Sequence, residues 1–169
     1  MERRWVIKEK GDEQIIQKLC KELDINEHLA NLLAQRGISN FEEARAFFRP
    51  EISQLHDPFL MKDMDVAVSR IQKAIRNNEK ILVYGDYDVD GTTAVSLVYS
   101  YFHQFYPNVA TYIPDRYAEG YGISYEGIDF ASDNEFSLII ALDCGIKAID
   151  KVAYAKEKKI DFIVCDHHR

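Results

Sequence analysis

ILVYGDYDVDG, residues 81–91, joins a short apolar run to three aspartates at alternate positions and a glycine. Ile81–Tyr84 has the length and the β-branched and aromatic content of a buried strand. The acidic part resembles the first half of a calcium-binding EF-hand loop, but that loop needs a glutamate at its twelfth position and a helix before it. Leu97 is the twelfth residue counted from Asp86. The stretch therefore predicts a strand that ends in an acidic turn.

A regular alternation of strands and helices follows from this stretch to the end of the chain. Amphipathic helical segments are expected at 92–105, 124–131 and 147–158. The four apolar β-rich runs are Ile81–Tyr84, Val109–Ile113, Leu138–Leu142 and Phe162–Cys165. Strands that alternate with helices predict βαβ units, and the two strands that flank segment 147–158 should run in the same direction in one sheet. We expect an α/β fold in three layers, a parallel sheet with helices on both faces.

The residues before this region are expected to be helical. Apolar residues recur at helical spacing in segments 12–23 and 26–34, and a short third helix, with Ala44, Phe47 and Phe48 on its apolar side, should end at Pro50. A turn at 53–59 then leads into a long helix over 63–77, with Val66 among its inward residues. We therefore divide the chain into a helical N-terminal region, 1–60, and an α/β domain, 61–169.

Composition limits the classes of protein that fit. The chain has 169 residues and a net charge of −7. Its apolar runs reach only about five residues, far short of the roughly 20 needed to cross a bilayer. No secretory leader opens the sequence, so we expect a cytoplasmic protein without membrane contact. Its three cysteines lack metal-binding spacing. The negative charge argues against a basic nucleic-acid-binding surface over this whole chain.

Acidic residues and histidines follow three of the predicted strands. Asp86 and Asp88 follow the first, Asp143 follows the third, and Asp166, His167 and His168 follow the last. The carboxyl ends of parallel strands lie at one edge of a sheet, where ligands bind. Converging carboxylates repel one another unless cations lie between them, and oxygen ligands with an imidazole suit Mn²⁺ or Mg²⁺. For Asp90, capping of the next helix and metal ligation are equally good interpretations.

The loop Pro114–Gly122 follows the second strand at the same edge. Arg116 could hold a phosphate with two parallel hydrogen bonds, or form a surface salt bridge with Asp115 or Glu119. Tyr117 and Tyr121 could stack on bases, although packing is the more common role of loop tyrosines and is the one we favour.

Three motifs in order resemble those of the DHH phosphoesterase superfamily: GDYDVDG at 85–91, ALDCG at 141–145 and CDHH at 165–168. Within it, the chain resembles the RecJ family of bacterial single-strand-specific 5′-to-3′ DNA exonucleases. The segments QLHDPFLMKDMDVAV at 54–68 and IPDRYAEGYGIS at 113–124 extend this resemblance over most of the chain.

The resemblance implies a site with two Mn²⁺ or Mg²⁺ ions. By motif position, Asp86 and Asp88 would each hold one ion, Asp143 would bridge them, and His167 would join the second ion. His168 would contact the scissile phosphate or the leaving oxygen, next to Arg116 and, more weakly, Tyr121. Asp90 falls where many relatives carry an apolar residue and is the least supported ligand.

The resemblance also implies that the family's next conserved ligand, an aspartate, and further domains lie beyond Arg169. We therefore expect an N-terminal fragment with little or no nuclease activity of its own. The activity expected of the whole is 5′-to-3′ hydrolysis of single-stranded DNA in repair and recombination. A monomer is expected, with a helicase or a single-strand-binding protein as possible partners. The alternatives are a DHH phosphoesterase for small nucleotides or short oligonucleotides, and a non-catalytic replication scaffold.

Overall fold

The computed structural model describes residues 4–168 and shows two compact units, the first ending at Pro58 and the second beginning at Phe59. Residues 1–3 and 169 lie outside the described part. The expectation that no secretory leader opens the sequence rests on the start of the chain, and so it also falls outside this part. No helix within residues 4–168 is long and apolar enough to cross a membrane.

The first unit is helical, as predicted. Its helices are α1 (Glu13–Leu23), α2 (Glu27–Ala34) and α3 (Phe41–Phe48). Each begins after a side-chain cap, from Asp12, Asn26 and Asn40 in turn, whose oxygen accepts a hydrogen bond from a backbone N–H of the first turn. The core is small: Ile16, Leu19, Ala30, Leu33, Ile38 and Ala44.

Of the three residues predicted for the apolar side of α3, Ala44 is buried in this core, whereas Phe47 and Phe48 are largely exposed. Phe47 and Phe48 are 52% and 64% exposed. They line an apolar hollow of about 420 Å³ with Leu29 and Leu32 of α2. Ala44 lies one turn earlier on the same face of α3 and is fully buried, so the contact of this short helix with the core is made by its first half.

Two single 3₁₀ turns, η1 (Ile52–Gln54) and η2 (Pro58–Leu60), occupy the predicted turn region, and α4 (Met64–Arg76) follows. The expectation that Val66 points inward is wrong, because its side chain is 61% exposed. The core contacts of α4 come from its C-terminal half, through Ile71, Ala74 and Ile75. Val66 lies one to two turns too early in the helix to reach the sheet.

The second unit contains a four-stranded parallel sheet, which confirms the predicted fold class. Its strands are β1 (Lys80–Gly85), β2 (Val109–Tyr112), β3 (Phe136–Leu142) and β4 (Asp161–Cys165), in the order β2-β1-β3-β4. The strands β3 and β4, which flank the last crossover, are parallel neighbours, with Ile140 opposite Ile163. All four carboxyl ends therefore lie at one edge.

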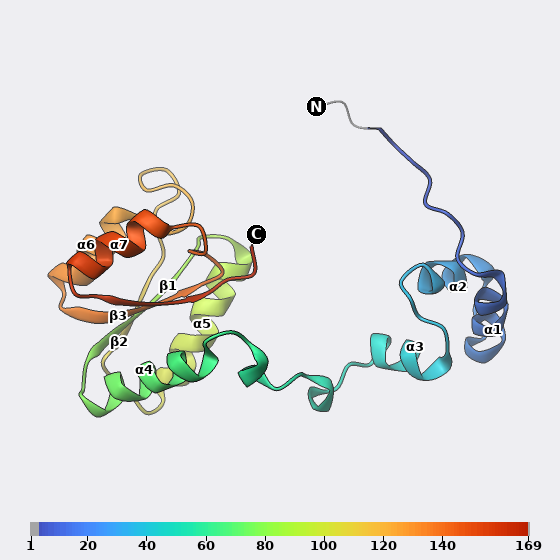
Figure 1. The fold of residues 1–169 in the computed structure, drawn as a ribbon, viewed down its shortest axis with the longest axis horizontal. Helices are drawn as coiled ribbons and strands as arrows, with labels where there is room; N and C mark the ends of the chain where they lie inside the picture. Colours follow the sequence, from blue (N-terminus) through green and yellow to red (C-terminus); the bar gives the residue numbers. More distant parts are fainter. Residues whose placement is uncertain (1–3, 169) are drawn as a thin grey trace. The chain divides into compact units, whose positions relative to one another are not determined.

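Helices cover both faces of this sheet (Figure 1), because alternate residues of a strand point to opposite sides. Ile81 and Val83 of β1 pack in one core with residues of α4 and of α5 (Val89–His103). Leu82 and Tyr84 pack in the other core with residues of α6 (Tyr125–Asp133) and α7 (Ile149–Glu157). Burying each such side chain contributes about 1.5–3 kcal/mol.

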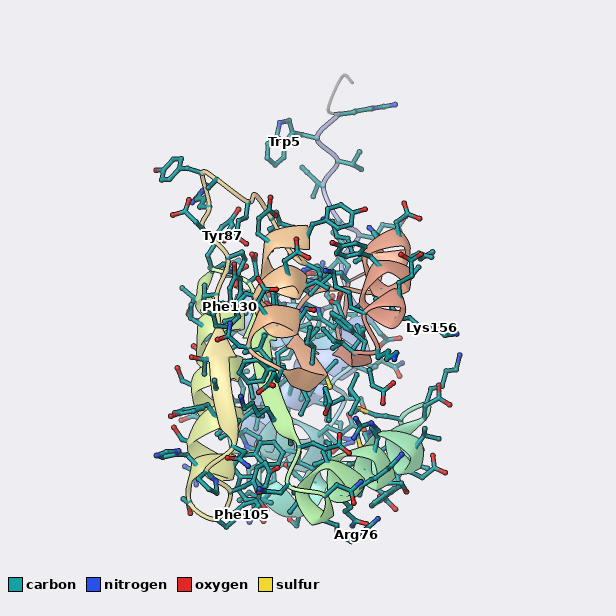
Figure 2. The ribbon with its side chains drawn as sticks, turned by 90° about the vertical axis from the view of Figure 1, so that its left-hand side faces the viewer. Trp5, Arg76, Tyr87, Phe105, Phe130 and Lys156 are labelled. Carbon is teal, nitrogen blue, oxygen red and sulfur yellow. The ribbon has the colours of Figure 1, made fainter. Side chains whose placement is uncertain are left out.

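The strand order places a switch point between β1 and β3. From β1 the chain crosses to β2 on one side, and β3 and β4 extend the sheet on the other. Ligands of open α/β sheets bind outside the carboxyl ends of strands at such a point. Figure 2 shows Tyr87, which follows β1, at the opposite end of the unit from Arg76 and Phe105. A ligand-binding site is therefore expected at the carboxyl edge of the sheet, near Tyr87.

The packing of α6 on the sheet gives the first testable prediction. A Cβ atom on Gly127 would lie 2.6 Å from Cε2 of Tyr84 and 2.9 Å from Oγ of Ser124. Such overpacking costs about 1–3 kcal/mol, against about 0.5–1 kcal/mol gained by removing a helical glycine. We expect Gly127→Ala to lower the free energy of unfolding by about 1 kcal/mol in urea denaturation. Glu126→Ala, an exposed change in the same helix turn, should change it by less than about 0.5 kcal/mol. Equal stability of Gly127→Ala and the parent would contradict this packing.

Candidate metal centre

Asp86 is the buried carboxylate of the carboxyl edge. Its side chain is fully buried directly after β1. A Cβ atom on Gly91 would lie 2.5 Å from the backbone oxygen of Asp86, so α5 begins in direct contact with this residue. One carboxylate oxygen, Oδ1, accepts a hydrogen bond from the backbone N–H of Gly122 at 3.3 Å. The other, Oδ2, is buried without a hydrogen-bond partner in the described part of the chain.

Asp88 is the N-cap of α5. Its Oδ1 accepts a hydrogen bond from the backbone N–H of Gly91 at 2.9 Å, and the side chain is otherwise exposed. Asp90 lies in the first turn of the helix and is also exposed. The interpretation of Asp90 as the cap is therefore wrong, because the extended backbone that a cap requires occurs at Asp88. Capping uses one oxygen of Asp88 and leaves the other for a ligand.

Asp143 meets the two histidines of the last motif. It follows β3 with a left-handed backbone, φ 60°, and its N–H donates to the carbonyl of Cys165 at 2.8 Å. Its Oδ1 lies 2.9 Å from Nε2 of His167. Ligand atoms of Asp143, His167 and His168 all lie within 4.8 Å of one another. The predicted site residues at the ends of β3 and β4 are thus brought together, while their individual roles stay predictions.

Asp166 orients His168, a role that the sequence analysis missed. Its Oδ2 accepts from the N–H of Ile146 at 2.9 Å, and its Oδ1 accepts from the N–H of His168 at 3.0 Å. The same Oδ1 lies 2.7 Å from Nδ1 of His168. A carboxylate that holds one imidazole nitrogen fixes the ring and leaves the other nitrogen for chemistry. The sequence feature that indicates this role is the position of the aspartate directly before the two histidines of the CDHH motif.

The pKa shifts reflect this concentration of carboxylates. The hydrogen bond to Asp166, aided by the charges of Asp166, Asp143 and Asp88, raises the pKa of His168. Burial acts to raise the pKa of Asp166, but hydrogen bonds from the backbone and the imidazole outweigh it, so this pKa is lowered. Burial is the main reason why the pKa of Cys144 is raised to about 12, and the negative charges of Asp86, Asp166, Asp143 and Asp88 add to this effect. Cys144 is therefore a neutral thiol at physiological pH.

Arg116 lies over an aromatic ring. Its guanidinium carbon is 5.2 Å from the ring centroid of Tyr87. The salt bridge proposed with Asp115 or Glu119 is absent within residues 4–168, so that alternative is wrong. The Asp115 carboxylate instead accepts hydrogen bonds from two backbone amides of the next turn, and the Glu119 carboxylate bonds to hydroxyl groups. The exposed guanidinium remains available for an anion.

The aromatic residues of this edge form a row. Tyr121, 57% exposed, makes edge-to-face contacts with Tyr87 and with His168, at ring-centroid distances of 6.2 and 6.5 Å. Tyr117 is 95% exposed, so the expectation that it packs in the loop is wrong. Its turn is held by backbone hydrogen bonds to Asp115, which need no side-chain packing. Beside His168 lies a hollow of about 280 Å³ whose lining includes Tyr121, Ile146 and Lys147.

The donor set fits a divalent cation. An unpaired buried carboxylate oxygen, as on Asp86, is costly unless a ligand satisfies it. Carboxylate oxygens from Asp86, Asp88 and Asp143 with imidazole nitrogen match the preferences of Mn²⁺ and, for the oxygens alone, Mg²⁺. The charges of the same three aspartates act together on Tyr121, after burial, to raise its pKa. All three aspartates therefore act on Tyr121, but among the described residues the ligand atoms that lie within 4.8 Å of one another are those of Asp143, His167 and His168, without Asp86 or Asp88.

The second unit matches a known protein family. Residues 80–169 match the family model for the N-terminal domain of the DHH family. The match covers more than half of the chain, and the chain therefore belongs to the DHH family.

Its relatives include proteins named single-stranded-DNA-specific exonuclease RecJ. The one from Bacillus subtilis (strain 168) is 40% identical over 165 residues, which are 98% of this chain and 21% of the relative. The one from Salmonella typhimurium is 32% identical over 146 residues, or 86% of this chain and 25% of the relative. The chain thus spans about a fifth to a quarter of the length of these relatives.

Two solved structures share the fold. A crystal structure of exonuclease RecJ bound to manganese has a TM-score of 0.60 and 30% identity, and the match covers 64% of this chain and 28% of that one. The structure of RecJ from Thermus thermophilus in complex with Mn²⁺ has a TM-score of 0.70 and 22% identity, over 95% of this chain and 22% of that one. The latter similarity is one of fold.

The orientation of His168 by Asp166 is testable by titration. The pKa of His168 is raised above the ordinary value of about 6.5. The hydrogen bond therefore favours folding below that pH and is lost as the pH rises through the higher, folded-state pKa. We expect Asp166→Asn to lower the pKa of His168 toward the ordinary value in NMR titration of the metal-free chain.

Asp133→Asn is the matched control, because Asp133 is an exposed aspartate at the end of α6, away from the site. It should leave the titration of His168 unchanged. An unchanged midpoint in Asp166→Asn would show that the carboxylate does not hold the imidazole.

Proposed function

We propose that this chain is the metal-binding part of an exonuclease that hydrolyses single-stranded DNA from 5′ ends. The observation that carries the proposal is the gathering of Asp143, His167 and His168 at the carboxyl edge of the sheet, beside a buried carboxylate of Asp86 with an unpaired oxygen. The 40% identity to the B. subtilis exonuclease supports the choice of substrate. A scaffold protein has no need for such converging ligands.

Two Mn²⁺ or Mg²⁺ ions are the proposed cofactors. In the complete protein, Asp86, Asp88, Asp143 and His167 would hold these ions. When bound, these ions supply positive charge to the phosphate and lower the pKa of a water molecule. Asp90, exposed on the first turn of α5, is left out of the proposed set.

His168 is the proposed proton donor. Its Nδ1 faces the Asp166 carboxylate at 2.7 Å, so the ring keeps a proton there and its Nε2 is free. The raised pKa favours the imidazolium, in which Nε2 also carries a proton. That proton is donated to a phosphate oxygen or to the leaving 3′ oxygen. In this role His168 stays functional to a higher pH than an isolated histidine would.

The loop after β2 is the proposed contact to DNA. Arg116, exposed and free of ion pairs within residues 4–168, presents a planar guanidinium that suits a phosphate. Tyr121 offers a half-exposed ring beside His168 on which a base can stack. Tyr87 lies beneath Arg116 and contacts Tyr121, so it holds the two groups side by side.

The remaining proposals concern the whole protein. With about a fifth of its relatives' length, this chain alone should degrade DNA weakly or not at all. Divalent ions would offset part of its net charge of −7, and most of the basic path for DNA would lie elsewhere. A role in repair and recombination, action as a monomer in the cytoplasm, and cooperation with a helicase or a single-strand-binding protein complete the proposal.

Metal binding by the chain tests the centre. We expect Asp143→Asn to weaken binding of Mn²⁺ by more than about 100-fold, beyond the range for partners outside the ligand shell. Isothermal titration calorimetry of the 169-residue chain measures this dissociation constant. Asp133→Asn removes the same charge far from the edge and should change the constant less than about twofold. Equal weakening in both variants would indicate a general charge effect and no specific centre.

The activity itself is testable on a protein of the relatives' full length that includes these 169 residues. With Mn²⁺, it should release nucleotides from single-stranded DNA with a free 5′ end and leave a 5′-blocked strand intact. The Asp143→Asn variant should lose at least about 10³-fold in rate if the carboxylate holds the ions that stabilise the transition state. Cleavage of dinucleotides without attack on longer strands would instead identify a phosphoesterase for small substrates.

A further inference from the structure

A buried hydrogen-bond network connects the end of β1 to the loop before α6, and none of its members is among the metal ligands proposed above. We propose that Tyr84 and Glu119 are positioning residues that hold Asp86 in place through the backbone of Gly122. This inference rests on the proposed function, because it concerns how a ligand of the metal centre is kept in its orientation.

Tyr84 fixes the backbone on either side of Gly122. Its hydroxyl is fully buried, donates to the carbonyl of Gly122 at 3.0 Å, and accepts from the N–H of Ser124 at 3.0 Å. Its ring stacks on that of Tyr112 in the neighbouring strand, with centroids 5.3 Å apart. Because β1 and β2 are paired in register at these two tyrosines, the sheet itself sets the position of the hydroxyl.

Glu119 accepts three hydrogen bonds, one from a residue of β2 and two from the loop that follows this strand. One oxygen accepts from the hydroxyls of Ser124 at 2.5 Å and Tyr112 at 2.8 Å, and the other accepts from the N–H of Asp115 at 2.7 Å. All three groups are donors, so they suit a charged carboxylate. Burial opposes that charge, but the hydrogen bonds prevail and lower the pKa of Glu119. All of these hydrogen bonds can therefore form at the same time, with the Tyr84 hydroxyl donating its proton to the carbonyl of Gly122.

Gly122 connects this hydrogen-bond network to Asp86. Its backbone is left-handed, φ 78°, which turns its N–H toward Oδ1 of Asp86 at 3.3 Å while its carbonyl faces Tyr84. This is the single hydrogen bond that the Asp86 carboxylate receives within residues 4–168. Holding Oδ1 determines where the unpaired Oδ2 points. Partners outside the ligand shell that orient a ligand typically contribute about 10- to 100-fold in metal affinity.

A matched pair of tyrosines separates positioning from general stabilisation. Tyr84→Phe removes a hydroxyl at the carboxyl edge. Tyr106→Phe removes a buried hydroxyl at the opposite end of the sheet, where it donates to the backbone carbonyl of Glu79. Both changes should lower the Tm of the 169-residue chain to a similar degree. We expect Tyr84→Phe alone to weaken Mn²⁺ binding, by about tenfold in isothermal titration calorimetry.

Glu119 provides a second test with a conservative rescue. Glu119→Gln keeps an oxygen for the Asp115 N–H, and the two hydroxyls can rotate to accept from the amide, so Mn²⁺ affinity should stay within about threefold of the parent. Glu119→Ala removes every acceptor and should weaken binding by about tenfold or more. Crystal structures of the two variants should show Gly122 displaced only in Glu119→Ala.

The outcomes distinguish this inference from the proposed function. If the parent chain binds Mn²⁺ and Tyr84→Phe and Glu119→Ala bind it equally well, the positioning role is wrong and the metal centre stands. If Tyr106→Phe weakens binding as much as Tyr84→Phe, the network acts through stability alone, and the inference fails. If the parent binds no Mn²⁺, the proposed centre is overturned and the positioning role with it.

Discussion

Helix α5 begins against the backbone of Asp86, with no room for a side chain between them. A Cβ atom on Gly91 would overlap the backbone of Asp86, and one on Gly85 would lie 2.4 Å from the Val95 side chain. This contact between a strand and the helix that follows it forces the chain to turn sharply within a few residues. The turn buries the Asp86 carboxylate and leaves Asp88 to cap the helix. The position of the Asp86 carboxylate, which we propose as a metal ligand, is thus set by backbone packing.

The centre combines groups of very different exposure. Asp86 is fully buried and Asp143 is 9% exposed at its side chain, whereas the side chain of His167 is 74% exposed. Carboxylates held by strands and glycine contacts cannot move far without disrupting the core. The imidazoles, carried on the segment after the edge strand β4, are held by hydrogen bonds to Asp143 and Asp166. Two of the proposed acidic ligands, Asp86 and Asp143, are therefore fixed by the packing of the fold, whereas the more exposed imidazoles are fixed by hydrogen bonds.

Sequence patterns predicted the fold well because strand and helix periods are strong signals. All four strands and the seven α-helices of residues 4–168 were predicted within a few residues of their observed bounds. The convergence of Asp143 with the histidines followed from the parallel sheet alone. The cap of α5 could not be placed, because aspartates at alternate positions offer several equivalent starts. The roles of Asp166 and Glu119 depend on hydrogen bonds that form only in three dimensions, and the exposure of Phe47 depends on how far along α3 the contacts with the core extend.

The left-handed backbone of Asp143 narrows what could ever replace it. At φ 60°, residues with bulky or branched side chains are strained, and asparagine and aspartate are the side-chain-bearing residues best tolerated. Glutamate at position 143 would keep the negative charge but has a weaker preference for this backbone conformation. Asparagine would keep the backbone preference but would lose the charge. Two independent requirements, one conformational and one chemical, thus meet at a single position.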